Sequence, residues 1–195
     1  MQKLNHPLEK LVKTITYKGV EFEVIERPDV IWVGCVDYAS NNTDESDTGA
    51  TIKRYQELVE LAPKNKIVNP DWSAALSINY SCADKPCGIM YANECYTDKQ
   101  DERYDLVTQP GGLWLRVRND AKAAELVGFD SSEPFNPWKY SHMYFAGNQA
   151  PLPSAAKENG YIQNPDVHIQ IEYHCHAEYS NPPHTNYAYI PIIAV

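Results

Sequence analysis

The sequence lacks several features that would assign it to a common class of protein. It has no apolar run long enough to cross a membrane, and its first residues lack the apolar core of a signal peptide. Its five cysteines are odd in number and include no C-x-x-C pair, which argues against a disulfide framework. The net charge of -9 opposes a phosphate-tracking surface. We therefore expect a reduced, cytoplasmic protein that binds neither membranes nor, directly, nucleic acid.

The motifs of common enzyme classes are also absent. The sequence contains no G-x-S-x-G elbow, no phosphate-binding glycine loop, no H-E-x-x-H and no dinucleotide fingerprint. Cys175 alternates with His174 and His176 on a predicted strand, so a local Cys–His pair cannot form there. We accordingly assign no catalytic residue and no cofactor.

The length and composition of the chain suit one folded domain. With 195 residues, of which 43% are hydrophobic, it can bury a substantial core. Strands are predicted over 15–25 and 30–38, with a turn at residues 27–29, and over SAALSINYS and CGIMYANECY. Between these pairs, ATIKRYQELVELA has apolar residues at helical spacing. The first half therefore has the order strand, helix, strand, strand.

The second half repeats this order. YDLVTQPGGLWLRVR predicts a strand pair or a bent strand, and a short helix over 120–127 and a less regular helical region over 138–145 follow. The strands VHIQIEYHCH and NYAYIPIIAV complete the half. We expect an α+β fold in a single domain over residues 1–195, with halves at about 14–98 and 103–195.

The predicted strand over 168–176 is polar along one face. Because residues two apart in a strand share a face, Ile169, Ile171 and Tyr173 are expected to pack against the helices. The opposite face consists of His168, Gln170, Glu172, His174 and His176. That face meets water, a cavity or a metal, and we favour a cavity wall. We expect no structural zinc at His174 and His176.

Aromatic residues are abundant, with 14 Tyr and 4 Trp. Many of them fall in predicted strands, among them Tyr38, Tyr91, Trp114, Tyr187 and Tyr189. Together with the strand carboxylate of Glu172, they are typical of a pocket for a flat or cationic organic molecule. Aromatic faces and a desolvated carboxylate both attract a cation, and both attractions strengthen when water is excluded.

Three segments carry a family resemblance: YDLVTQPGGLWLRVR, IQIEYH and YAYIPII. They resemble the successive strand motifs of the GyrI-like small-molecule-binding family, whose domain is also the effector-binding domain of many AraC-type and some MerR-type multidrug-sensing regulators. The resemblance covers the chain from about Val30 onward. It implies tandem β-α-β-β modules with pseudo-twofold symmetry, antiparallel sheets with helices on one side, and a ligand groove between the modules. It places the family's pocket glutamate at Glu172 and pocket aromatics at Trp114, Tyr189 and Tyr91.

The expected function is that of a stand-alone binding domain for a hydrophobic or cationic aromatic small molecule, used in sensing or sequestration. With no room for a helix-turn-helix before the first strand, contact with DNA would need a separate protein of unknown identity. The resemblance implies two alternatives: hydrolysis of cyclopropane-containing genotoxic compounds, and a protein-interaction role like that of gyrase inhibitors. A second acid or base facing Glu172 would favour the hydrolase, and His174 is the nearby candidate.

Overall fold

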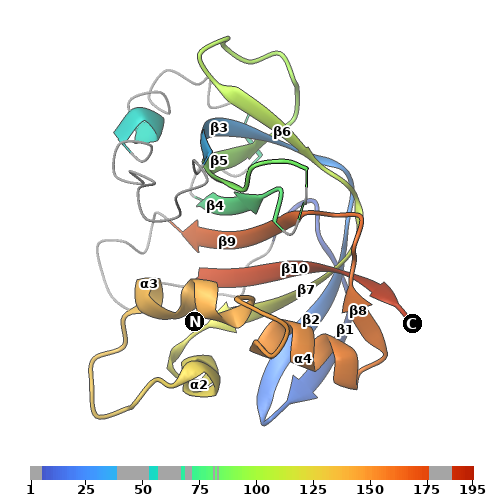
Figure 1. Ribbon diagram of the computed structural model, residues 1–195, viewed down its shortest axis with the longest axis vertical. Helices are drawn as coiled ribbons and strands as arrows, with labels where there is room; N and C mark the ends of the chain where they lie inside the picture. Colours follow the sequence, from blue (N-terminus) through green and yellow to red (C-terminus); the bar gives the residue numbers. More distant parts are fainter. Residues whose placement is uncertain are drawn as a thin grey trace.

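Ten strands form one antiparallel sheet in the part of the chain that the computed structural model describes, residues 6–38, 53–56, 67–68, 72–80, 82, 84–175 and 186–195. Helices pack against one face of this sheet (Figure 1), so the predicted α+β class is confirmed. The strand order is β1-β2-β7-β10-β9-β4-β5-β3-β6, and β8 also pairs with β10. No helix among the described residues is both long and apolar enough to span a membrane.

The bounds of the elements are as follows. The strands are β1 (Lys10–Tyr17), β2 (Val20–Arg27), β3 (Val30–Tyr38), β4 (Trp72–Ile78), β5 (Gly88–Cys95), β6 (Asp105–Gln109), β7 (Gly112–Asn119), β8 (Tyr161–Gln163), β9 (Ile169–Cys175) and β10 (Asn186–Ala194). The helical elements are α2 (Ala121–Ala124), η2 (Glu125–Val127), α3 (Pro137–Tyr140), η3 (Ser141–Tyr144) and α4 (Pro151–Glu158). Residues 53–56 are also helical.

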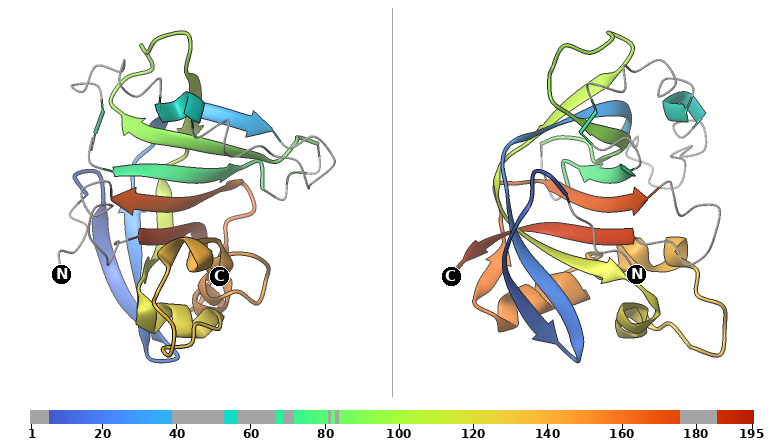
Figure 2. Two further views of the ribbon diagram at one scale, coloured as in Figure 1. Left: turned by 90° about the vertical axis from the view of Figure 1, so that its left-hand side faces the viewer. Right: turned by 180° about the vertical axis from the view of Figure 1, so that it is seen from behind.

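The same three-strand unit occurs twice in the sheet. Strands β3, β4 and β5 lie in the order β3-β5-β4, and β7, β9 and β10 lie in the order β7-β10-β9. The second strands of the two units, β4 and β9, pair antiparallel at the centre, where Figure 2 shows them side by side. Helical residues separate the first two strands of each unit, as in the predicted β-α-β-β repeat. The single domain over 1–195 and its halves at about 14–98 and 103–195 stay a prediction.

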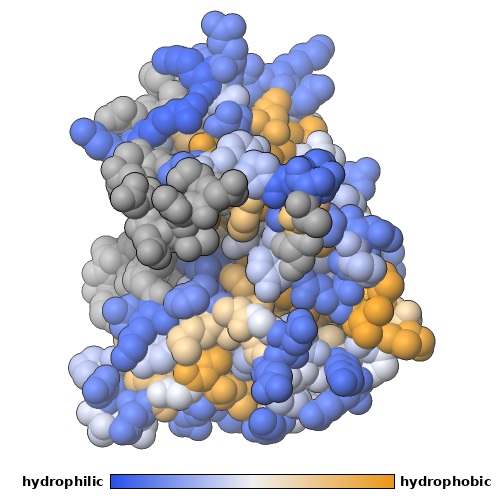
Figure 3. Space-filling view, in the orientation of Figure 1, coloured by the Kyte–Doolittle hydropathy of each residue, from blue (hydrophilic) through white to orange (hydrophobic). Residues whose placement is uncertain are grey.

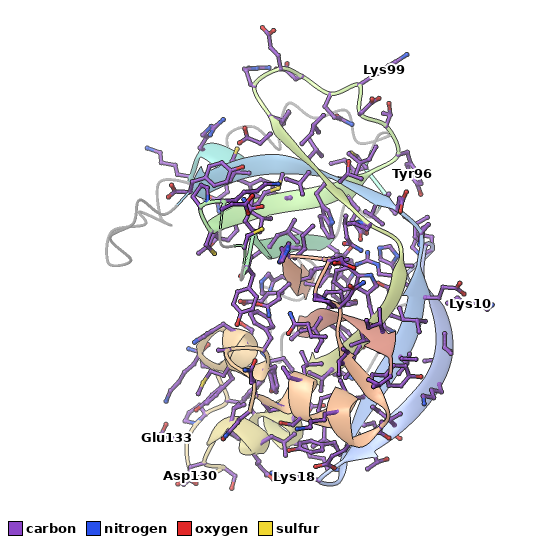
Figure 4. The ribbon with its side chains drawn as sticks, turned by 45° about the vertical axis from the view of Figure 1, so that its right-hand side comes forward. Lys10, Lys18, Tyr96, Lys99, Asp130 and Glu133 are labelled. Atoms are coloured by element: carbon purple, nitrogen blue, oxygen red, sulfur yellow. The ribbon has the colours of Figure 1, made fainter. Side chains whose placement is uncertain are left out.

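The segment 15–25 is a hairpin, where the sequence predicted a single strand. Lys18 and Gly19 join β1 to β2 with φ angles of 48° and 79°. Both angles lie in the left-handed region that a two-residue hairpin turn of type I′ requires. Lysine is an unusual first residue for that turn, so the sequence signal was weak. Figure 4 places Lys18 at the hairpin tip, at the opposite end of the molecule from Lys99 in the β5–β6 loop.

Two bent stretches of chain connect the two halves of the sheet. β2 continues into β3 through residues 28–29, and β6 continues into β7 through residues 110–111. β2 pairs with β7, and β3 pairs with β6, so the two bends run beside each other. The Gly111 N–H donates a hydrogen bond of 2.7 Å to Asp29 Oδ1 across them. The bent-strand alternative is therefore the one the fold adopts for YDLVTQPGGLWLRVR.

Helix α4 was not predicted from the sequence, because two prolines lie near the start of this helix. Pro151 and Pro153 both lie in the first turn, where backbone N–H groups have no partner within the helix. Proline therefore removes no hydrogen bond there and even favours the first position. Leu152, Ala155 and Ala156 are 0% exposed, so the helix is held by packing.

Two buried clusters define the two faces of the sheet. On the helical face, α2, η3 and α4 pack on β1, β2, β7 and β10 through residues such as Ala123, Tyr144 and Leu152. Ile169, Ile171 and Tyr173 belong to a different cluster, made of strand residues on the inner face, away from the helices. The prediction that these three side chains face the helices is therefore wrong, although all three are buried as expected.

Candidate functional site

Glu172 lies at the centre of the sheet on its helical face. In the register of the strands, Glu172 of β9 is opposite Ala75 of β4, and Ala75 is opposite Tyr91 of β5. Side chains that lie opposite one another on neighbouring strands point to the same face. Tyr91 and Glu172 therefore project from the same face with only the methyl group of Ala75 between their strands.

The helical face is only partly covered at this point. Five of the side chains that point to it from β4, β5 and β9 are half-buried, namely Ala75, Ser77, Ile89, Tyr91 and Glu172. We call these five residues the central patch. Their inner-face neighbours Leu76, Met90 and Ile171 are 0% exposed. Helical residues cover the sheet on both sides of the patch: Tyr55 packs near Tyr91 on one side, and η3 contacts Glu172 on the other. The patch thus lies between the two modules.

The carboxyl group of Glu172 is held in an environment that favours its neutral form. Burial raises its pKa, and a hydrogen bond from Ser141 and the nearby His142 oppose this only in part. The Ser141 Oγ–H donates that bond to Glu172 Oε2 over 2.5 Å. Burial also raises the pKa of Tyr91, and the charge of Glu172 adds to the effect. A cation placed here would stabilise the ionised carboxylate.

Of the remaining predicted ligand-binding residues, one more shares the face of Glu172. His174, two residues along β9, is 2% exposed and lies opposite Ser73 of β4. Tyr38, at the end of β3, is 52% exposed and its ring lies against Gly88. The central patch therefore unites Glu172 and Tyr91, with His174 buried beside them.

Three predicted aromatics lie on the opposite face of the sheet. Trp114, Tyr187 and Tyr189 are members of the buried inner-face cluster. The resemblance had implied that Trp114 and Tyr189 lie around Glu172. They lie instead on the other face of the sheet. The sequence carried a signal for this split: Tyr187 and Tyr189 flank Ala188, and it is Ala188 that lies opposite Glu172.

The inner face of the sheet holds a buried polar cluster that the sequence did not predict. The carboxylate of Glu94 has 0% side-chain exposure and forms an ion pair with Arg27. It also accepts hydrogen bonds from His6 Nε2 and, over 2.9 Å, from the Tyr173 hydroxyl. Glu9 Oε1 lies 3.4 Å from Arg27 Nε. We call these residues the Glu94 cluster. Its sequence signal was the alternation along β5, which places Glu94 on the same face as the apolar Met90 and Ala92 and so at a core position.

Beside the Glu94 cluster, a cleft of about 460 Å³ opens on the inner face. Its lining residues are Thr16, Gly19, Val20, Glu21, Glu23, Arg116, Arg118, Asp120, Lys122 and Tyr187. The lining contains both acidic and basic side chains, and Arg116 forms ion pairs with Glu23 and Glu9. The Arg116 guanidinium also lies 5.0 Å from the centre of the Tyr187 ring. Tyr187 thus lines this cleft and is separated from the central patch by the sheet.

The protonation of His6 makes the Glu94 cluster sensitive to acid. The Leu8 N–H donates to His6 Nδ1 over 3.1 Å, so Nε2 carries the proton that is donated to Glu94. Burial lowers the pKa of His6 to about 4, with Glu9 opposing this shift and Arg27 and Arg116 adding to it. The imidazole is therefore neutral at pH 7.

We expect His6 to make the protein less stable as the pH falls from 6.5 to about 4. Its folded pKa lies below its ordinary value of 6.5, so the unfolded chain binds more protons in this window. Stability from this residue is fully present above pH 6.5 and decreases by roughly 2–3 kcal/mol as the pH falls to about 4. His6→Gln keeps a donor for Glu94 but cannot titrate. Urea unfolding of both proteins at pH 7, 5.5 and 4.5 should show a smaller acid loss in the variant, and equal losses would contradict the assignment.

Among the described residues, no group of three or more His, Cys, Asp and Glu side chains could hold a metal ion. His176 and His184 lie outside those residues, so the absence of zinc at His174 and His176 stays a prediction.

On the face in Figure 3, hydrophilic residues predominate, and an apolar patch lies near the C-terminus, where Ile193 and Val195 are 37% and 87% exposed.

Comparison with known proteins identifies the fold. No protein-family model and no curated protein sequence matches the chain. A protein of bacterial transcription regulation from Staphylococcus aureus MU50 matches at 14% identity over 89% of this chain and 99% of its own, with a TM-score of 0.53. The EcmrR C-terminal domain matches at 13% over 90% and 99%, with a TM-score of 0.57. SAV2435 bound to tetraphenylphosphonium matches at 13% over 88% and 93%, with a TM-score of 0.53.

These comparisons define the class of fold to which the chain belongs. The chain has the same α+β fold as a transcription regulation protein, an isolated C-terminal domain and a protein bound to an organic cation. At identities of 13–14%, the likeness concerns the fold alone. It agrees with the fold that the resemblance of the strand motifs implied.

Proposed function

We propose that the chain is a member of the GyrI-like family and binds a hydrophobic or cationic aromatic small molecule at the central patch. The observation that carries this proposal is Glu172, a carboxyl group with a raised pKa on a half-buried surface between two modules, beside Tyr91. The binding of tetraphenylphosphonium by SAV2435, which has the same fold, supports it. The ligand would occupy a groove over the patch.

The physical basis is compensation of a desolvated charge. An ionised carboxylate that is buried without a partner costs several kcal/mol of solvation, and one hydroxyl donor offsets only part of this cost. A ligand cation would complete the compensation at Glu172. Its aromatic rings would stack on Tyr91, where each cation–π contact adds about 0.5–2 kcal/mol. The small side chains of Ala75 and Ser77 leave room for such rings.

The proposed role is sensing or sequestration of the ligand in the cytoplasm. Two of the similar structures are a protein of transcription regulation and the C-terminal domain of EcmrR, and they support a link to regulation. On this proposal the chain does not contact DNA itself but acts through a separate regulator, or by lowering the free ligand concentration.

We expect Glu172→Gln to weaken cationic ligands by roughly tenfold or more relative to neutral ones, since about 1.4 kcal/mol corresponds to one decade of affinity. The substitution keeps the shape of the side chain and removes its charge. It should leave the empty protein as stable as the wild type, or more stable, because a desolvated charge is lost. Fluorescence titrations with tetraphenylphosphonium and with neutral triphenylphosphine oxide measure the two affinities.

Glu21→Gln is the matched control for this experiment. Glu21 is exposed and lines the inner-face cleft, so its substitution changes the net charge equally without touching the central patch. It should leave both affinities unchanged within about twofold. Equal losses for both ligands in Glu172→Gln, or no loss for either, would mean that Glu172 does not select for charge.

A second candidate function is hydrolysis of a cyclopropane-containing electrophile at the same site. The observation that favours it is again Glu172, because a carboxyl with a raised pKa suits a general base that activates water. In that case wild type would convert such a compound to a ring-opened hydrated product, and Glu172→Gln would bind it without turnover. Mass spectrometry of the compound after incubation distinguishes the two functions: unchanged compound excludes the hydrolase.

A further inference from the structure

Gln170 is buried on the helical face without a hydrogen-bond partner. Its side chain is 1% exposed, and neither Oε1 nor Nε2 has a partner in the part of the chain that the structure describes. The great majority of buried polar side-chain atoms in proteins are hydrogen-bonded, because a bare buried amide loses its bonds to water. Such a residue therefore calls for an explanation.

The position of Gln170 relates it directly to the central patch. It precedes Glu172 by two residues on β9, so both side chains project from the same face about 7 Å apart along the strand. Across the sheet, Gln170 lies opposite Ser77, which belongs to the patch and is half-buried. The amide of Gln170 is thus at the border of the surface where the ligand is proposed to bind.

A second buried glutamine, Gln109, differs from Gln170 in having one amide atom that is hydrogen-bonded, although its Nε2 also has no partner among the described residues. Gln109 on the inner face is 0% exposed, and its Oε1 accepts a 2.9 Å hydrogen bond from Trp32 Nε1. Its amide oxygen therefore orders a neighbouring side chain. No contact of that kind involves the amide of Gln170 among the described residues. A methionine of similar size could fill the same space without a polar group.

We propose that Gln170 recognises an amide-like group on the ligand, so that the preferred ligand of the central patch is an aromatic cation that carries a carboxamide or lactam. This inference rests on the proposed function. The side-chain amide of glutamine offers one acceptor and two donor hydrogens, and another amide complements it with both kinds of group. Glu172 would hold the cationic part of the ligand and Gln170 the amide, on one face of one strand.

Selectivity follows from what happens when the ligand has no amide. An aromatic cation without this group would still be attracted to Glu172 and Tyr91, but would leave Gln170 bare in the complex. Sites built to hydrogen-bond a polar group discriminate strongly against analogues that lack it. The patch should therefore distinguish between two cations of equal charge and similar size.

The test compares 1-benzylnicotinamide, an aromatic cation with a carboxamide, with 1-benzylpyridinium, which lacks it. We expect wild type to bind 1-benzylnicotinamide about tenfold more tightly, as measured by isothermal titration calorimetry. Gln170→Met should abolish this preference while leaving the affinity for 1-benzylpyridinium within about twofold. The empty variant should also melt at a higher temperature than wild type, because the bare amide is gone.

The outcomes separate this inference from the proposed function. Gln163→Met, on the half-buried strand β8, is the control and should keep the wild-type preference. If neither cation binds wild type, the proposed function fails and this inference falls with it. If both bind wild type equally, or if folded Gln170→Met keeps the preference, only the role of Gln170 is overturned. The wild-type comparison decides the matter even if the variant does not fold.

Discussion

Gly34→Ala is expected to prevent folding or to destabilise the protein by more than about 4 kcal/mol, because it forces two main chains apart. A Cβ atom at Gly34 would lie 1.9 Å from the Tyr91 carbonyl oxygen and 2.7 Å from the Ala92 Cα. These atoms belong to β5, which is paired on both sides, with β3 and with β4. The strand cannot move without breaking one of the two ladders. Circular dichroism of the purified variant and its urea unfolding midpoint measure the effect.

Two further variants identify the clashing atom. Ala92→Gly, added to Gly34→Ala, removes a side-chain contact at 2.8 Å but leaves the carbonyl oxygen at 1.9 Å, so it should not restore folding. Gly88→Ala, at the end of the same strand, brings its Cβ only to 3.0–3.2 Å from its neighbours and should cost much less. A stably folded Gly34→Ala protein would show that β3 and β5 do not approach each other this closely.

Arg27→Met is expected to destabilise the protein by about 3–5 kcal/mol, because it leaves the buried carboxylate of Glu94 without its countercharge. Both side chains are 0% exposed, so water cannot replace the lost partner. Methionine retains the aliphatic part of the arginine side chain, which limits the loss of packing. Urea unfolding at pH 7 followed by tryptophan fluorescence gives the free energy of unfolding.

The double variant Arg27→Met, Glu94→Gln tests the electrostatic origin of this loss. The amide introduced by Glu94→Gln would be neutral yet could still accept hydrogen bonds from His6 and Tyr173, so about half of the lost stability or more should return. A double variant as unstable as the sum of its single variants would assign the loss to packing around Arg27. Such additivity would contradict an ion pair at the centre of the Glu94 cluster.

Local sequence patterns predicted most elements of the fold. The apolar strands β3, β4, β5, β9 and β10 and the helical segment 121–127 were found from periodicity and turn residues. The segments that were missed had misleading local signals. The Lys18-Gly19 turn is not a common hairpin sequence, and the prolines of α4 suggest a break in a helix although they occupy its first turn.

The candidate site was predictable only in part. Alternation along β9 places Gln170, Glu172 and His174 on one face, and the structure keeps them there. The same rule separates Tyr187 and Tyr189 from Ala188, but only the pairing of β10 with β9 reveals that Ala188 is the residue opposite Glu172. The family resemblance had assigned Glu172 and Tyr189 to a single pocket, since resemblance between motifs carries no information on register.

The sequence by itself determined which side chains share a face of a strand, because alternation is a property of the local backbone. It also determined the α+β class through the order of its apolar segments. Only the tertiary structure decided which face meets the helices, which strands are neighbours, and that Arg27, Glu94 and His6 converge. These features depend on contacts between residues far apart in the chain, up to 88 positions for His6 and Glu94. No local pattern encodes such contacts, since they arise from how the whole chain buries its apolar surface.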